Sequence, residues 1–213
     1  MTASVRHSRG LDVEESSSPA WRSHAPTPYY NLAASIEVAR RIYRHSGETC
    51  DRRALAALLG YSRVKNGAFL TRVAAAKMFG LLDEREGRIS LSDRGRATVA
   101  SATVVGGLQA RIEAFLKVEV FRLVFQTYRG RALPSNAALM RLLKSRFKVI
   151  GTRVGRTVRV LLQSAAHAGL LSRGAGRIRL SFPESAERVR WRAVPARLRV
   201  GPSGSLGPSS FPS

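Results

Sequence analysis

A short pattern of glycines and alternating apolar residues occurs twice in this chain of 213 residues, and it limits the possible folds. The first copy reads Gly80-Leu81-Leu82, four further residues, and Gly87-Arg88-Ile89-Ser90-Leu91-Ser92. The second copy, shifted by 89 residues throughout, reads Gly169-Leu170-Leu171, four further residues, and Gly176-Arg177-Ile178-Arg179-Leu180-Ser181. A repeat usually corresponds to one structural unit. We therefore expect one unit twice: a helix that ends at a glycine, then two short strands joined by a tight turn.

The chain is strongly basic, with 36 Lys and Arg against 14 Asp and Glu and a formal net charge of +22. Such an excess attracts polyanions. Nucleic acid is the favoured partner, an anionic membrane surface is the rival, and a coding bias toward arginine is the neutral explanation. Cys50 is the single cysteine, so the chain forms no internal disulfide, and a reducing cytoplasm is the expected compartment.

Targeting and membrane segments are not expected. Residues 1–10 lack the apolar stretch of a signal peptide. No apolar run reaches the roughly 18 residues that a membrane-spanning helix needs. We therefore expect a cytoplasmic protein without a membrane partner, associated with the nucleoid if it binds DNA.

Composition and periodicity divide the chain into four parts. We expect a flexible arm over 1–27, one domain over 28–104, a second over 105–182, and a basic, disordered tail over 183–213, which is rich in Gly, Pro and Ser toward its end. The apolar content of 44% is enough to build cores in the two central parts. Each domain is small and therefore marginally stable alone, so packing of one against the other would help both.

The first domain shows a helical pattern over 31–45, and Asp51 can cap a second helix that ends at Gly60. A third helix, capped by Ser62 or Asn66, runs to about residue 79. Strands are expected near 81–82 and 88–91 around a turn over 83–87. Ser92 or Asp93 can cap a closing helix.

The second domain has the same predicted order of helix, helix, helix, strand and strand. One helix or two broken helices cover 112–125, and Ser135 offers a cap for a middle helix. The next helix begins at Gly151, and its apolar stripe consists of Val154, Val158, Leu161, Leu162 and Ala165. Strands are expected at 170–171 and 177–180.

Two segments, 55–62 and 79–82, resemble winged helix-turn-helix DNA-binding domains. Four others resemble a family of uncharacterised prokaryotic tandem winged-helix proteins: Tyr30-Asn31-Leu32, Ile36-Glu37-Val38-Ala39, Asn66-Gly67-Ala68-Phe69 and Ala74-Ala75-Ala76-Lys77. The resemblance covers 28–182. It implies a mainly α fold with small β-wings, in two tandem winged helix-turn-helix domains. It does not imply a target, so function has to be argued from surface residues.

A winged helix places its third helix in the major groove of DNA and its wing on the adjacent backbone. In the second domain, Arg153, Arg156 and Arg159 recur every three residues, covering a helix face about 120° wide. Gln163 continues this face and could pair with an adenine. The predicted wing adds Arg173, Arg177 and Arg179. Residues 105–182 carry fifteen Lys and Arg against two Glu, so the second domain is the favoured DNA-binding domain.

The first domain is less basic, with thirteen Lys and Arg against seven acids over 28–104. Its candidate contact residues are Arg63, Lys65, Asn66 and Arg72. The predicted wing tip, 83–86, is acidic and would repel a phosphate backbone. We therefore expect the first domain either to read DNA with its helix only or to pack against a protein partner.

Other functions remain as alternatives. The arginines could form a solvated helix face, the two domains could be a protein-interaction module in a larger complex, and RNA could replace DNA. Catalysis and cofactors are not expected, because no phosphate loop, dinucleotide fingerprint or acid–base pair stands out. The four histidines are scattered and match no zinc spacing, so no metal is expected. The sequence predicts a DNA-binding regulator of transcription or of another DNA transaction.

Overall fold

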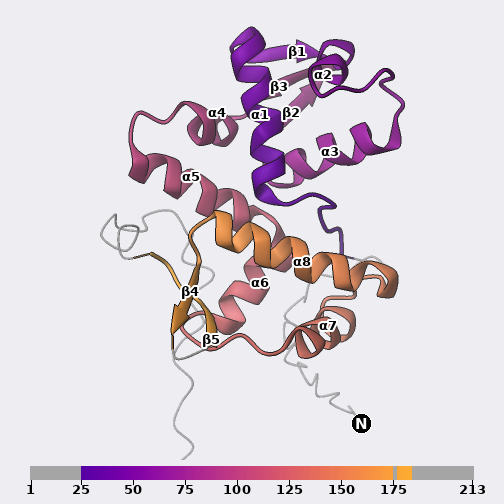
Figure 1. The fold of residues 1–213 in the computed structure, drawn as a ribbon. Coiled ribbons are helices and arrows are strands. Elements are labelled where there is room, and N and C mark those ends of the chain that lie inside the picture. The colour runs from indigo at the N-terminus through magenta and orange to yellow at the C-terminus, as the bar shows by residue number, and fades with distance from the viewer. Residues whose placement is uncertain (1–24, 175–176, 184–213) are drawn as a thin grey trace, which may run out of the picture.

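The structure is a computed structural model that describes residues 25–174 and 177–183, and it is mainly helical with two small antiparallel sheets (Figure 1). The first half of the described chain comprises α1 (Leu32–Ser46), β1 (Thr49–Asp51), α2 (Arg52–Leu58), α3 (Gly67–Met78), β2 (Leu82–Arg85), β3 (Arg88–Leu91) and α4 (Asp93–Ala100). The second half comprises α5 (Val104–Lys117), α6 (Glu119–Tyr128), α7 (Asn136–Ser145), α8 (Gly151–His167), β4 (Leu171–Gly174) and β5 (Arg177–Leu180). The four-part division of the chain stays a prediction. The structure describes neither the arm before residue 25 nor the tail after residue 183.

Side-chain caps set the starts of several helices. Asp51 accepts a hydrogen bond from the Ala54 N–H and begins α2, as the sequence predicts. Between the alternatives left open for α3 and α4, Asn66 and Ser92 are the caps. Ser135 caps α7, which confirms that prediction as well.

The repeated pattern folds in the same way in both halves. Gly80 and Gly169 adopt positive φ angles of 66° and 70°, which glycine tolerates without steric cost. Two backbone hydrogen bonds then recur with a shift of 89 residues. The Leu81 N–H donates to Ala76 as the Leu170 N–H donates to Ala165, and the Ser92 N–H donates to Leu81 as the Ser181 N–H donates to Leu170. The strand registers match too, with Leu82 opposite Leu91 and Leu171 opposite Leu180.

Strand β1 is absent from the sequence prediction. It is only three residues long, and it adds to the edge of the hairpin to give the strand order β1-β3-β2. The second half has a shorter counterpart, because Arg129 and Ala132 form isolated bridges to Leu180 and Arg179 of β5. The bridging segment therefore follows α6 as β1 follows α1, and the elements from α6 to β5 come in the same order as those from α1 to β3, with α5 as an additional helix before them.

The two halves share one hydrophobic core rather than meeting through a polar joint. Helix α1 packs against α3 of its own half and against α8 of the other, and α4 packs against α5 (Figure 1). The ring of Phe121 on α6 lies 6.1 Å from that of Phe79 and 5.4 Å from that of Phe115. Ala25 and Thr27, at the end of the segment predicted to be a flexible arm, are also buried.

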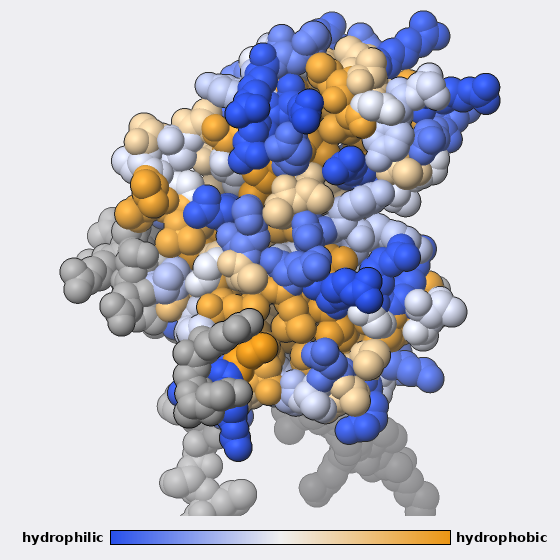
Figure 2. Space-filling model, viewed as in Figure 1, coloured by the Kyte–Doolittle hydropathy of each residue, from blue (hydrophilic) through white to orange (hydrophobic). Residues whose placement is uncertain are grey.

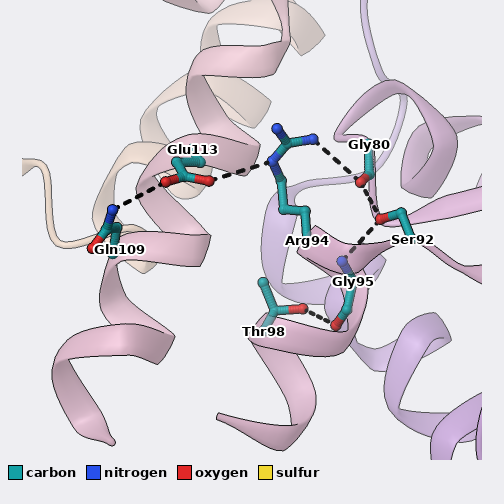
Figure 3. A network of polar contacts seen from close by, with 7 residues as sticks. All are labelled: Gly80, Ser92, Arg94, Gly95, Thr98, Gln109 and Glu113. Carbon is teal, nitrogen blue, oxygen red and sulfur yellow. Dashed lines mark hydrogen bonds and ion pairs between the residues drawn. The ribbon is translucent and has the colours of Figure 1, made fainter. Parts of the chain in front are cut away.

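A polar network crosses the junction between α4 and α5 (Figure 3). The Gly80 carbonyl accepts from the Ser92 hydroxyl at 2.6 Å and from Nη1 of Arg94 at 3.4 Å. Glu113 on α5 lies 4.0 Å from Nε of Arg94 and accepts from Gln109. The helix–glycine turn of the first half is thereby tied to the first helix of the second half.

Gly95 allows α4 to pass close to this turn. A Cβ atom at this position would lie 2.0 Å from the Leu81 carbonyl oxygen, a rigid backbone atom.

We expect Gly95→Ala to lower the free energy of unfolding by at least about 2 kcal/mol, because α4 has to move. Gly67→Ala is the matched control, since a Cβ there meets nothing within 4 Å. Urea denaturation measures both, and an equal effect of the two substitutions would contradict the steric account.

The shared core predicts one cooperative unfolding transition for the whole chain. Phe121→Ala should cost about 3–5 kcal/mol and shift the entire calorimetric peak downward, since its ring also contacts Phe79 of the first half. Scanning calorimetry of the full chain checks this. Two resolved peaks, of which only one moves in the variant, would mean that the halves unfold independently.

Candidate nucleic-acid interface

Helix α8 has a wide buried side and a narrower exposed side. Val154, Val158, Leu161 and Ala165 are buried, as predicted, and so are Thr157, Val160 and Ser164. The remaining side is exposed and carries Arg156, Arg159 and Gln163, and Arg153, in the first turn of the helix, is exposed at its edge. We call these four residues the α8 ridge. Figure 2 shows hydrophilic residues gathered over one end of α8, where it crosses the front of the molecule. The predicted ridge is therefore not buried between the halves.

The segment 27–32 of the first half runs along one edge of α8. The Thr27 and Thr157 hydroxyls lie 3.2 Å apart, and the Leu32 N–H donates to Oγ of Ser164 at 3.0 Å. Nδ2 of Asn31 donates to Oε1 of Gln163 at 2.9 Å. Because bidentate pairing with adenine uses the carbonyl and the amino group of a glutamine, base reading by Gln163 would compete with Asn31.

The arginines of the ridge form no ion pair with an acid of the described residues. Arg153 and Arg156 lie over the ring of Tyr29, with guanidinium carbons 4.9 Å and 4.3 Å from its centroid. The ion pairs among the described residues involve other cations. The reason lies in the sequence, because 120–183 contains thirteen Lys and Arg and no Asp or Glu. Among the described residues, carboxylates therefore compensate little of the positive charge of this half, the exception being Glu119, which pairs with Arg122 at 3.6 Å.

Further exposed cations lie on the second half. Arg177 and Arg179 are exposed on β5, whereas Arg173 lies on β4 and its side chain falls outside the described residues. The exposed cations that precede α8 are Arg129, Arg131, Arg141, Lys144, Arg146 and Lys148. The surface therefore offers more cations than the predicted site residues alone.

Lys148, in the turn between α7 and α8, was not among the predicted site residues. It is exposed and adopts a positive φ of 52°, a conformation that is uncommon for residues with a Cβ. The α2–α3 turn uses Gly60, with φ 79°, for its own left-handed position. A strained residue of this kind often belongs to a functional surface, and here it places a cation next to α8.

The first half does not present a matching ridge. Arg63 and Lys65 are exposed in the turn before α3, whereas Asn66 uses its Oδ1 to cap the helix by accepting from Ala68 and Phe69. Arg72 is half-buried, with its guanidinium 5.4 Å from the ring centroid of Tyr30. The sequence contains a signal for the burial of Arg72. Phe69 and Ala76 are both buried and lie at i−3 and i+4 from it, so Arg72 shares their side of α3. The exposed positions of α3 are mostly small or apolar: Gly67, Ala68, Leu70, Ala74 and Lys77.

The predicted acidic wing tip of the first half needs correction. Strand β2 extends through Arg85, so the tip is only Glu86-Gly87. Glu84 points back to the helices, where it accepts from Arg52 at 2.5 and 3.2 Å and from Lys77 at 3.0 Å. The hydrogen bonds from Arg52 and Lys77 lower the pKa of Glu84 below its ordinary value. This carboxylate links β2 to α2 and α3, and the two cations neutralise its charge.

Cys50 and His167 also have shifted pKa values. Burial raises the pKa of the Cys50 thiol, which disfavours the reactive thiolate. Partial burial, with the charges of Arg111 and Arg40, lowers the pKa of His167. No group of three or more potential ligands is found among the described residues. No helix in the described ranges has the length and apolar character to cross a bilayer.

Comparisons with protein-family models, with curated proteins and with solved structures found no match to this chain. The assignment of a function therefore rests on the charge, exposure and geometry of the residues themselves.

The tie formed by Glu84 predicts a pH-dependent contribution to stability. Its pKa is lower in the folded chain than the ordinary 4.5, so the carboxylate stabilises the fold above that value, and the contribution is lost as the pH falls through the lowered pKa. We expect Glu84→Gln to cost about 1 kcal/mol at pH 7 and nothing below the lowered pKa. Urea denaturation between pH 7 and pH 3 measures this. The exposed Glu86→Gln is the control, and a pH-independent difference for Glu84→Gln would contradict the mechanism.

Proposed function

We propose that the chain consists of two tandem winged helix-turn-helix units and binds double-stranded DNA through α8. The fold assignment is supported by the order of helix, strand, helix, helix, strand and strand in the first half, and by its β1-β3-β2 sheet. In the second half, the bridges from Arg129 and Ala132 to β5 support the same arrangement. In such a unit α8 is the third helix, and the β4–β5 hairpin is the wing.

The observation that carries the functional proposal is the exposed, carboxylate-free ridge on α8. Helix-surface charges that serve solubility are commonly interspersed with charges of opposite sign. Here Arg153, Arg156 and Arg159 face solvent on the helix that a winged helix-turn-helix uses for contact, in a stretch of 64 residues without an acid. A phosphate backbone is the ligand that best matches such a surface.

The rest of the proposal follows from this contact. The protein acts as a regulator of transcription or of another DNA transaction, it works in the cytoplasm on the nucleoid, and it has no catalytic role of its own. Arg177 and Arg179 on the wing contact the flanking backbone together with Arg173. Arg63 and Lys65 form a weaker, peripheral contact.

A second candidate function is contact with a protein partner through the first half. It is favoured by the face of α3, where Leu70 is 39% exposed among small neighbours and Lys77 is tied to Glu84. This candidate is compatible with DNA binding by α8, because the two surfaces lie on different helices.

We expect the triple variant Arg153→Glu, Arg156→Glu and Arg159→Glu to fold and to lose duplex binding by at least about 100-fold. If each arginine contacts one phosphate, the slope of log K against log salt should fall by about 3 in magnitude. Fluorescence anisotropy with a labelled duplex between 50 and 200 mM salt measures both quantities.

The matched control is Arg44→Glu, Arg53→Glu and Arg85→Glu, three exposed arginines of the first half with no ion pair among the described residues. It changes the net charge equally and should retain most of the affinity. Equal loss in both triples would assign binding to net charge alone. Stronger binding of the wild type to RNA than to a duplex DNA of matched sequence would reassign the ligand.

A further inference from the structure

Tyr29 has an unusual position, because one ring serves two arginines of a different structural half. It lies two residues before Asn31, the N-cap of α1. The chain around it is held on α8 from both sides, by Thr27 at Thr157 and by Leu32 at Ser164. The backbone on either side of Tyr29 is therefore anchored to α8, and the ring lies beside Arg153 and Arg156.

The stacking leaves the donors of both arginines available. Each guanidinium carries five N–H groups that point outward in its plane, whereas the attraction to an aromatic ring uses its face. Neither side chain makes a hydrogen bond or an ion pair with another described residue. Both guanidinium carbons lie within 5 Å of the same ring centroid, so two sets of unused donors are held close together.

We propose that Tyr29 is a positioning residue that holds Arg153 and Arg156 as a paired clamp for a backbone phosphate of the duplex; this inference rests on the proposed function. Two cations this close repel each other in the free protein, and the electron-rich ring face offsets part of that repulsion. A bound phosphate offsets the remaining repulsion and accepts hydrogen bonds from both guanidinium groups.

The location of the clamp favours a phosphate over a base edge. At about 100° per residue, Arg153 falls between the buried positions Thr157 and Val160, on the edge of α8 that faces α1. When a helix lies in the major groove of DNA, a side chain on the edge of that helix contacts the phosphate backbone beside the groove. Such contacts do not read the base sequence directly. The clamp should therefore strengthen binding to all duplexes alike.

The test compares Tyr29→Leu with Tyr29→Phe in the full chain. Leucine fills the site without an aromatic face, whereas phenylalanine retains it. We expect Tyr29→Leu to weaken binding about 5- to 30-fold, equally on duplexes of different sequence, and to change the salt slope by less than one, since no charge is removed. Tyr29→Phe should bind like the wild type. Tyr43→Leu is the control, because Tyr43 is an exposed tyrosine elsewhere on α1.

A double-mutant cycle separates positioning from a general structural effect. With Arg153→Ala and Arg156→Ala already present, Tyr29→Leu should cause no further loss of affinity. Wild-type affinity in Tyr29→Leu, equal loss in Tyr29→Leu and Tyr29→Phe, or an undiminished loss in the double-alanine background would each overturn the clamp. Failure of the wild-type protein to bind any duplex would instead overturn the proposed function.

Discussion

The burial of α8 on two sides is the interaction on which the rest of the structure depends. One side of the helix closes the core of the second half, and the adjacent side packs on α1 and the segment 27–32 of the first half. What remains exposed is one strip, and that strip holds the arginines. The first half thus determines how α8 is oriented relative to the rest of the molecule. Two flexibly linked units would present α8 at variable angles, whereas a shared core presents it at one.

The repeat has diverged most where function would be expected. The glycine turn, the hairpin register and the apolar stripe are the same in both copies, because each is needed to close a small core. The exposed faces differ. On α3 this face is small and nearly uncharged, and its half-buried Arg72 lies over Tyr30, whereas on α8 the arginines reach solvent. The first copy packs against α8 through α1, while the second copy supplies the cationic face of α8, so two similar units present one strongly cationic helix.

The sequence was sufficient for features that depend on neighbouring residues. Helix caps such as Asp51 and Ser135, and the exposed side of α8, follow from local chemistry and helical periodicity. Features that depend on distant residues were missed. Strand β1 exists because β3 is beside it, Glu84 of β2 is neutralised by Arg52 of α2, and Tyr29 contacts arginines more than a hundred positions away. No local pattern contains these pairings, so the sequence placed Glu84 in an acidic turn and did not identify the contacts of Tyr29.

The unopposed charge of the second half also has an energetic consequence. Thirteen cations without an acid between 120 and 183 repel each other, and this repulsion disfavours the compact state. An apolar core confined to this half would have to offset it alone, and such a core is small. In the shared core, apolar burial from both halves offsets the repulsion, since Phe121 of the second half packs against Phe79 of the first. A bound polyanion would remove much of the repulsion and stabilise the fold by binding the native state. The shared core is therefore what allows the chain to keep this unopposed charge in a folded state.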